Sequence, residues 1–194
     1  MSRRQIGLFF GSFNPVHTGH MILANFMATQ TSLDEVWIVV SPQNPFKKRG
    51  SLARDHDRLH LVELAIGDTP GLRASRVEFD LPKPSYTIDT LAVLRDRHRE
   101  YDFSLIMGSD NLASLPKWKN ADIILRDYHI HVYRRPEYPA GELSGHPHVT
   151  VYDAPLMRLS ATYVRNCLRE GKSIRYLVPE AVVAELEKSG LYRR

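Results

Sequence analysis

The sequence predicts a single doubly wound α/β domain, with a mostly parallel central sheet flanked by helices. Apolar runs that suit strands alternate with helical patterns almost from end to end of the chain. No internal repeat, low-complexity block or linker divides the 194 residues, and this length suits one domain with a sizeable core. Crossovers between parallel strands are right-handed. Open sheets of this kind bind ligands at the carboxyl ends of their strands, so we expect the site there.

Composition limits the classes of function. The chain is 43% hydrophobic and 25% charged, which are ordinary values for a globular protein. Its net charge of +4 suits anionic small molecules as well as nucleic acid. The single Cys167 excludes an internal disulfide and a cysteine-based zinc cluster, which predicts a reducing, cytoplasmic location. No apolar run approaches the roughly 20 residues that span a membrane, and no export signal is recognisable, so no membrane partner is expected.

The first half of the chain is expected to alternate strands with helices. The apolar run "IGLFF" stops at Gly11, "EVWIVVS" is closed by Pro42, and "LRASRVEFD" can hold one or two short strands. Helical patterns predict three helices, at residues 18–30, 53–67 and 86–101. Thr87 is the expected cap of the third. Residues 42–51 carry two prolines and three consecutive cations, which indicates a loop.

The second half continues the alternation. Strands are expected at "DFSLIMG", "HIHVYRR" and "HVTVYDA". A short helix and the segment 115–127 follow the first of these, and residues 136–147 are rich in Pro, Gly and polar residues, which indicates a surface loop. Two helices follow: "SATYVRNCLREG" is stopped by Gly171, and "VPEAVVAELEKSG" has Pro179 near its start and Gly190 at its end.

The stretch "GSFNPVHTGH" follows the first expected strand. It matches neither the G-x-G-x-x-G dinucleotide fingerprint nor the G-x-x-x-x-G-K-[ST] phosphate loop. It offers a glycine turn that a ligand can approach and free N–H groups where a helix begins, and both suit a phosphate. His17 and His20 share one face of the first helical turn, so both can donate to phosphate oxygens. The simpler alternative is a pair of surface or core histidines; a zinc site is disfavoured because no third ligand is evident.

This stretch resembles the G-x-F-x-P-x-H-x-G-H signature of the nucleotidyltransferase α/β superfamily. "LSATYVR", residues 159–165, resembles the second signature, I-S-S-T-x-[IV]-R, with Leu159 for Ile and Ala161 for the second Ser. The resemblance implies a Rossmann-like fold and a reaction in which a phosphate attacks the α-phosphorus of a nucleoside triphosphate and pyrophosphate departs. Ser160 would cap a helix and Arg165 would fold back toward its start, so both could hold the β- and γ-phosphates. Alone, this segment would be an ordinary Ser-capped helix with an exposed Arg.

Longer segments are similar to the bacterial nicotinate-nucleotide adenylyltransferase family over nearly the whole chain. They are "PSYTIDTL", "MGSDNLASLPKWKNADIIL" and "GKSIRYLVPEAVVAEL", the last followed by "GLY". The resemblance implies an enzyme of NAD biosynthesis that transfers AMP from ATP to nicotinate mononucleotide, giving deamido-NAD and pyrophosphate. It also implies one nucleotidyltransferase domain over residues 1–194, in which the last helices, residues 160–194, complete the ATP site.

The resemblance further implies roles for individual residues. The implied catalytic residues are His17, His20 and Arg165. The implied ATP-binding residues are Gly11, Ser12, Phe13, Gly108, Asp110, Ser160 and Thr162. The implied substrate-binding residues are Lys47, Thr87, Trp118 and Arg134.

In this assignment Trp118 stacks on the pyridine ring, and the backbone near Thr87 receives the nicotinate carboxylate. Lys47 and Arg134 hold the mononucleotide phosphate, but Lys48 and Arg135 compete with them for this role. Simpler alternatives are core packing for Trp118 and a helix cap for Asp110. Cys167 matches no functional position and is expected to be half-buried.

Mg²⁺ is expected to arrive with ATP, because no carboxylate cluster in the sequence indicates a protein-built metal site. The expected partners are ATP and nicotinate mononucleotide. Nucleic-acid binding is not expected, since only the pI near 9.2 and "PFKKRG" favour it. The oligomeric state stays open, a homo-oligomer included. The alternative functions are phosphopantetheine adenylyltransferase, a cytidylyltransferase, and a nucleotide-binding regulator without turnover.

Overall fold

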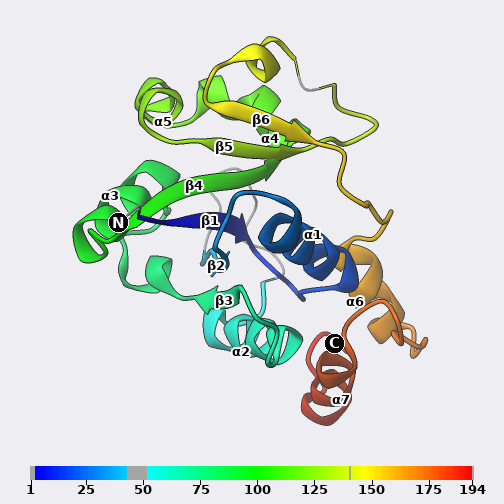
Figure 1. Ribbon diagram of the computed structural model, residues 1–194. Coiled ribbons are helices and arrows are strands. Elements are labelled where there is room, and N and C mark those ends of the chain that lie inside the picture. Colours follow the sequence, from blue (N-terminus) through cyan, green and yellow to red (C-terminus); the bar gives the residue numbers. More distant parts are fainter. Residues whose placement is uncertain (1–2, 43–51, 140, 194) are drawn as a thin grey trace.

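One parallel sheet forms the centre of the computed structural model, which describes residues 3–42, 52–139 and 141–193. Within these residues the sheet has six strands in the order β3-β2-β1-β4-β5-β6 (Figure 1). The strands are β1 (Arg4–Gly11), β2 (Glu35–Val40), β3 (Leu72–Ser75), β4 (Tyr101–Gly108), β5 (Ile130–Tyr133) and β6 (Val149–Tyr152). Every neighbouring pair is parallel, so the predicted doubly wound α/β fold is confirmed.

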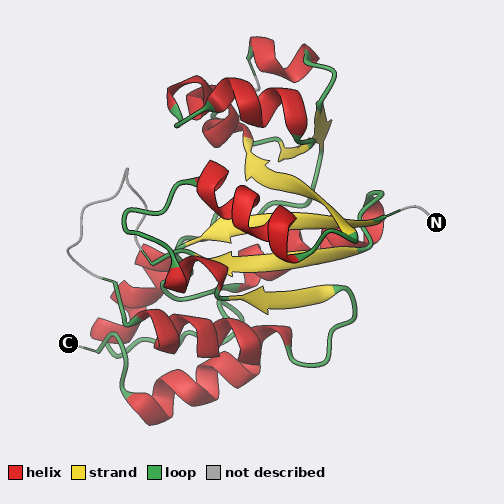
Figure 2. Ribbon diagram, turned by 90° about the vertical axis from the view of Figure 1, so that its left-hand side faces the viewer, coloured by secondary structure: helices red, strands yellow, loops and turns green. Residues whose placement is uncertain are grey.

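Helices cover both faces of the sheet (Figure 2). They are α1 (Thr18–Gln30), α2 (Asp55–Ile66), α3 (Thr87–Arg97), α4 (Ser109–Ser114), α5 (Ala121–Asp127), α6 (Ala161–Arg169) and α7 (Glu180–Ser189). Short 3₁₀ helices lie at Val77–Asp80, Leu115–Lys117 and Glu142–Gly145. Near the carboxyl terminus, α6 lies beside α1, and α7 packs against α2 (Figure 1).

Two hydrophobic cores lie on opposite faces because successive strand residues point to opposite sides. In β2, Val36 and Ile38 join a core with α1, α2, α6 and α7. Trp37 and Val39 join the other core, with α3, α4 and α5. A parallel sheet covered on both faces needs strands that are apolar on both sides, which explains the continuous apolar runs of the sequence.

Two expectations need correction, the Thr87 cap and the exposure of Cys167, whereas the one short strand in the segment 72–80 and the exposed loop near residues 136–147 are confirmed. Only Leu72–Ser75 of the segment 72–80 is a strand, because the chain then turns into a 3₁₀ helix, with an N–H of Phe79 donating to the carbonyl of Arg76 (2.9 Å). Thr87 does not cap α3. The N-cap is Tyr86, whose backbone is extended and whose carbonyl accepts the first hydrogen bonds of the helix. The predicted surface loop 136–147 contains the 3₁₀ turn Glu142–Gly145.

Cys167 is the second correction, because it is buried and not half-buried. It lies on the apolar face of α6 between Val164 and Leu168, at the spacing that directs side chains into a core. Other boundaries agree with expectation, since α1 spans the predicted residues and Gly190 follows α7 in the left-handed conformation (φ 66°).

Arg58 is a fully buried arginine that fixes the loops after β1 and β2. One terminal nitrogen of its guanidinium donates to the carbonyls of Ser12 and of Ser41, the latter at 2.9 Å. Nε donates to the carbonyl of Ala53 (3.2 Å), and the other terminal nitrogen pairs with Asp55 (2.8 Å). The two strand ends are therefore held by one buried charge that is fully hydrogen-bonded.

We predict that Arg58→Met destabilises the fold by about 3–5 kcal/mol, because Asp55 and three carbonyls lose their donor. Urea unfolding of both proteins measures this difference. Arg54→Met is the matched control: Arg54 is exposed just before the same helix, so a change within about 0.5 kcal/mol is expected. A loss below about 1 kcal/mol in Arg58→Met would contradict the anchoring role.

Candidate active site

The sequence-predicted residues gather at the carboxyl edge of the sheet. Gly11 is in register with Val40, and Gly108 with Tyr133, so the loops that follow these strands meet at one edge. Because every neighbouring pair of strands is parallel, all the carboxyl ends lie along this edge. Gly11 is required there because a Cβ would lie 2.7 Å from the ring of Phe13.

His17 and His20 form a stacked pair at the start of α1. Their ring centroids are 3.6 Å apart and the planes differ by 18°. The backbone N–H of His17 donates to Nδ1 of His20 (3.2 Å), so a neutral His20 carries its proton on Nε2. The His20 ring also meets Phe13 edge-on, with centroids 5.0 Å apart. The predicted sharing of one face is confirmed, and the phenylalanine under the pair fixes its orientation.

His17 is the buried member of the pair. Burial lowers the pKa of His17 to about 4, although a hydrogen bond with its own backbone opposes the shift. Its Nδ1 is buried and has no hydrogen-bond partner among the described residues. At neutral pH the ring is therefore uncharged and offers one N–H, so His17 can orient an anion but carries no positive charge toward it.

Arg165 connects the second signature to the first. One terminal nitrogen of its guanidinium donates to the carbonyl of Asn14 (2.7 Å), and the other donates to Thr162 Oγ1 (3.2 Å). Burial, and then the nearby Arg169, lower the pKa of Arg165. Ser160 is the N-cap of α6, and its hydroxyl accepts from the N–H of Tyr163 (3.2 Å), as predicted. Arg165 is half-buried, so the alternative of an exposed Arg is wrong.

The start of α1 offers fewer free donors than the sequence predicts. The N–H of Thr18 donates to the carbonyl of Leu177 (2.9 Å), and its hydroxyl donates to the carbonyl of Tyr176 (3.0 Å). The N–H of His17 is used by His20, as described above. The expectation of free N–H groups needs correction for these two residues, because the chain after α6 returns to cover the helix start.

Asp110, Ser109 and Arg135 form a second polar group at the same edge. Asp110 pairs with Nε of Arg135 (3.3 Å), and the backbone N–H of Arg135 donates to Ser109 Oγ (2.9 Å). Arg134 is more exposed and pairs with Asp153 (2.8 Å). Asp110 does not cap α4, since Gly108 is the N-cap and Asp110 lies within the first turn. A side chain at Gly108 would collide with Asp110, so the glycine permits this approach.

Trp118 and Thr87 belong to neighbouring segments. The side chain of Lys119 pairs with Asp89 of α3 (2.8 Å) and lies over the ring of Tyr86 (4.9 Å). Trp118 is half-buried against the core under α3, and its indole N–H donates to Ser114 Oγ (3.3 Å). Thr87 is the first residue of α3. Lys47 and Lys48, the expected phosphate ligands, lie outside the described residues.

Glu78 is a buried carboxylate that the sequence analysis missed. Its Oε1 accepts from Thr90 Oγ1 of α3 (2.8 Å), and Ser41 after β2 also hydrogen-bonds it. Burial raises the pKa of Glu78, although both hydrogen bonds oppose the shift. Glu78 thus ties α3 to the end of β2. An acidic residue in a segment that resembles a strand was the only sequence signal, and it does not distinguish a buried side chain from a solvated one.

The described residues contain no group of three or more His, Cys, Asp or Glu side chains that could hold a metal ion. The candidate site therefore consists of hydrogen-bond donors and cations, with Asp110 as its carboxylate. Separately, none of the helices in the described ranges is both long and apolar enough to cross a bilayer.

Comparison with known proteins identifies the family. The cytidylyltransferase-like family model matches residues 8–167. A protein of Cytophaga hutchinsonii named "Probable nicotinate-nucleotide adenylyltransferase" is 53% identical over 178 residues, which cover 92% of this chain and 93% of the relative. The chain belongs to the nicotinate-nucleotide adenylyltransferase family. A relative of the same name from Flavobacterium johnsoniae is 44% identical, covering 98% of this chain and all of the relative (100%).

A solved member of this family has the same fold. The nicotinic acid mononucleotide adenylyltransferase of Plasmodium falciparum, complexed with NaAD, matches with a TM-score of 0.79 and 19% identity, over 97% of each chain. The similarity to nicotinate-nucleotide adenylyltransferases that the sequence segments indicated is therefore confirmed, as is the Rossmann-like fold.

The buried His17 predicts acid-sensitive stability. Its pKa falls from 6.5 to about 4 on folding, so below about pH 6.5 the unfolded chain takes up a proton that the folded ring does not. Its contribution to the free energy of unfolding is present above that pH and is lost as the pH falls toward 4, by about 3 kcal/mol in all.

Urea unfolding of wild type and His17→Gln at several pH values tests this prediction. The variant should lose less stability than wild type between pH 7 and 4, whatever its stability at pH 7. His131→Gln is the comparison, since burial also lowers the pKa of His131 to about 4, on β5. Identical pH profiles for wild type and His17→Gln would contradict the assignment.

Proposed function

We propose that this chain transfers AMP from ATP to nicotinate mononucleotide at the carboxyl edge of its sheet, through the residues described above. The contact between Arg165 and the carbonyl of Asn14 carries the proposal. It brings the two segments that match the superfamily signatures into one site, although they are 151 residues apart. A family member that keeps the histidines of the first segment and Ser160, Thr162 and Arg165 of the second, in contact with each other, has the groups to bind a triphosphate and to catalyse its reaction.

The reaction needs no nucleophile from the protein. An oxygen of the mononucleotide phosphate attacks the α-phosphorus of ATP, a new P–O–P bond forms, and the bond from that phosphorus to the β-phosphate oxygen breaks. The attacking phosphate is already an anion near neutral pH. The obstacle is to bring two polyanions together, so catalysis consists of positioning and electrostatic stabilisation.

Each signature then has its own task. His17 and His20 donate to the α-phosphate and its bridging oxygen, where negative charge develops in the transition state. Arg165, with the hydroxyls of Ser160 and Thr162, holds the β- and γ-phosphates that depart as pyrophosphate. In this proposal the last helices, residues 160–194, complete the ATP site. The remaining ATP contacts are assigned to Gly11, Ser12, Phe13, Gly108 and Asp110.

The mononucleotide binds on the other side of the reacting phosphorus. Trp118 offers a flat aromatic face to the pyridine ring, and the N–H groups that open α3 near Thr87 receive the carboxylate. Lys47 and Arg134 are the proposed phosphate ligands. The ion pair of Arg134 with Asp153 is exposed and weak, so its guanidinium can turn to a substrate phosphate, whereas Arg135 is already engaged by Asp110.

Mg²⁺ enters this proposal as part of the ATP substrate. The donors present here are imidazole, hydroxyl and guanidinium groups rather than clustered carboxylates, which suits an ion held by phosphates and water. When bound, Mg²⁺ offsets the charge of the phosphates. Cytoplasmic location stays a prediction from the sequence, and the oligomeric state stays open.

We predict that the purified protein converts ATP and nicotinate mononucleotide into a dinucleotide and pyrophosphate. Chromatography of the nucleotides together with a pyrophosphate assay measures both products. Turnover of phosphopantetheine instead of the mononucleotide would support the alternative adenylyltransferase, and tight nucleotide binding without product would support a regulator.

His20→Ala should lower kcat by about 10²–10³, because one preorganised donor to the transition state is lost. The fold should survive, since His20 is only half-buried. His60→Ala, at an exposed position on α2, is the control and should keep full activity. A folded His20→Ala enzyme with wild-type kcat would remove His20 from the mechanism.

Trp118→Ala should weaken the mononucleotide by about 5- to 150-fold and leave ATP binding nearly unchanged, since stacking of a base on an aromatic ring contributes about 1–3 kcal/mol. Trp118→Phe should recover much of the affinity, because a flat face remains. Separate titrations of the two substrates measure this. Equal weakening of both substrates would indicate that Trp118 supports the fold instead.

A further inference from the structure

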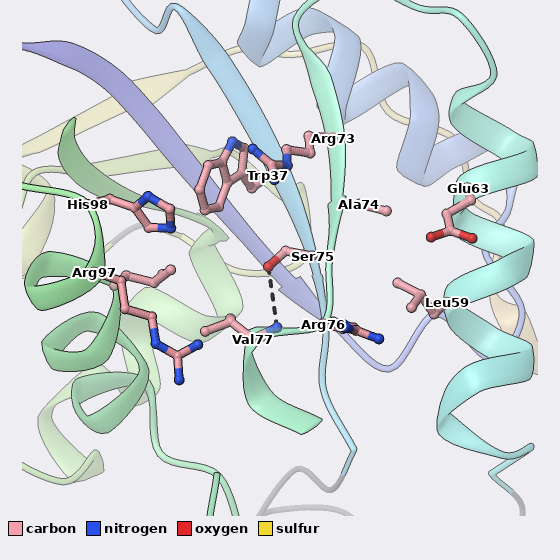
Figure 3. Close-up of a pocket in the computed structure, with 11 residues that line it drawn as sticks. Trp37, Leu59, Glu63, Arg73, Ala74, Ser75, Arg76, Val77, Arg97 and His98 are labelled. Carbon is pink, nitrogen blue, oxygen red and sulfur yellow. Dashed lines mark hydrogen bonds between the residues drawn. The ribbon is translucent and has the colours of Figure 1, made fainter. Parts of the chain in front are cut away.

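We propose that a cavity beside β3 binds a small phosphorylated anion at a site separate from the reacting centre. The cavity has a volume of about 290 Å³ and lies where β3 forms the free edge of the sheet, between α2 and α3. Figure 3 shows Trp37, Arg73, Arg97 and His98 around one side of β3, with Arg76 and Glu63 toward α2.

The cavity is lined by other residues than the candidate active site, although Arg76 and Val77 in its lining directly follow the carboxyl end of β3. α3 begins at the carboxyl edge of the sheet and runs back to the start of β4, so Arg97 and His98, at its end, lie toward the amino ends of the strands. The histidine pair follows the carboxyl end of β1. No residue assigned to ATP or the mononucleotide lines the cavity, so a ligand bound here would be distinct from both substrates in the reaction.

The charge of the lining favours an anion. The lining holds three arginines, Arg73, Arg76 and Arg97, and one carboxylate, Glu63; within the described residues none of the three arginines forms an ion pair. Nearby Arg99, by contrast, pairs with Asp96 (3.5 Å). Guanidinium groups bind phosphate oxygens through paired N–H donors, so Arg73 and Arg97, which share one side of β3, suit a phosphate, whereas Arg76 lies on the other side toward Glu63 (Figure 3).

A buried donor marks the same place. Trp37 is only 3% exposed, and its indole N–H has no acceptor among the described residues. The guanidinium of Arg73 lies over the indole ring, with its central carbon 4.7 Å from the ring centroid. Buried polar groups are normally paired, so this N–H lacks an acceptor; because the nitrogen has almost no accessible surface, a ligand oxygen reaches it only if the surrounding side chains shift.

Protection of the sheet edge is the competing explanation. Charged residues on an edge strand discourage pairing with another strand, and this would account for Arg73 and Arg76. It does not account for Arg97, which comes from α3, or for the unpaired indole N–H. The volume lies near the lower end of ligand pockets, which fits inorganic phosphates or a mononucleotide and excludes larger dinucleotides.

Fluorescence of Trp37 tests the proposal. The chain has two tryptophans, so Trp118→Phe leaves Trp37 as the one reporter. This protein is titrated with inorganic phosphate, pyrophosphate, AMP and adenosine. A saturable change is expected with at least one of the three phosphorylated probes and not with adenosine. Comparing inorganic phosphate and pyrophosphate with AMP shows whether the site binds inorganic phosphates or the phosphate group of a nucleotide.

Variants in the same background identify the site. Arg73→Gln and Arg97→Gln should each weaken binding about tenfold or more, because one charge-assisted contact is lost. Arg99→Gln is the matched control and should bind as the parent does, since Arg99 does not line the cavity. Three results would overturn the proposal and leave edge protection as the role of these arginines. They are no saturable response up to 10 mM, which is about 1,000 times the Kd of a roughly 10 µM site, an equal response to adenosine, and binding that both variants retain.

Discussion

The contact of Arg165 with the carbonyl of Asn14 is the interaction on which the candidate site depends. It holds the first loop after β1 against α6, and other bonds strengthen the same junction. Asn14 Oδ1 accepts from the hydroxyl of Tyr192 (2.8 Å) and from the N–H of Ala53 (3.0 Å). Because these partners lie 39 to 178 residues further along the chain, the loop keeps its shape only when the whole domain is folded. The geometry of the proposed phosphate site therefore depends on the whole fold rather than on a local motif.

Two groups of the candidate site, His17 and Arg165, differ in charge although burial lowers the pKa of both. His17 is neutral at physiological pH because it is desolvated, whereas the guanidinium of Arg165 stays charged despite a lowered pKa, since an arginine is not deprotonated in proteins. In the proposed reaction, the uncharged His17 would lie beside the reacting phosphorus and the charged Arg165 beside the leaving pyrophosphate, where negative charge accumulates. Arg58 stabilises the loop after β1, because it donates to the carbonyl of Ser12 from inside the core.

Local sequence patterns were sufficient for most of the fold and for part of the site. Continuous apolar runs identified the strands, and the Ser160 cap and the stacked histidines follow from rules that act over one helical turn. Contacts between distant segments were not predictable in this way. Nothing near Thr18 indicates that Leu177 takes its N–H, and nothing near Arg58 indicates that it is buried, because each depends on a residue far along the chain or on packing. The predicted Thr87 cap was wrong by one residue, because the helix begins at Thr87 and the N-cap is the extended residue before it.

The most direct test of the account is a crystal structure with a non-hydrolysable ATP analogue. The account predicts that the α-phosphate lies within hydrogen-bond distance, about 2.7–3.2 Å, of a ring nitrogen of His17 or His20. The β- and γ-phosphates should lie against Arg165, Ser160 and Thr162, with the contact from Arg165 to Asn14 preserved. A triphosphate bound away from the histidine pair, or a structure in which α6 has separated from the first loop, would contradict the claim that the two segments form one site.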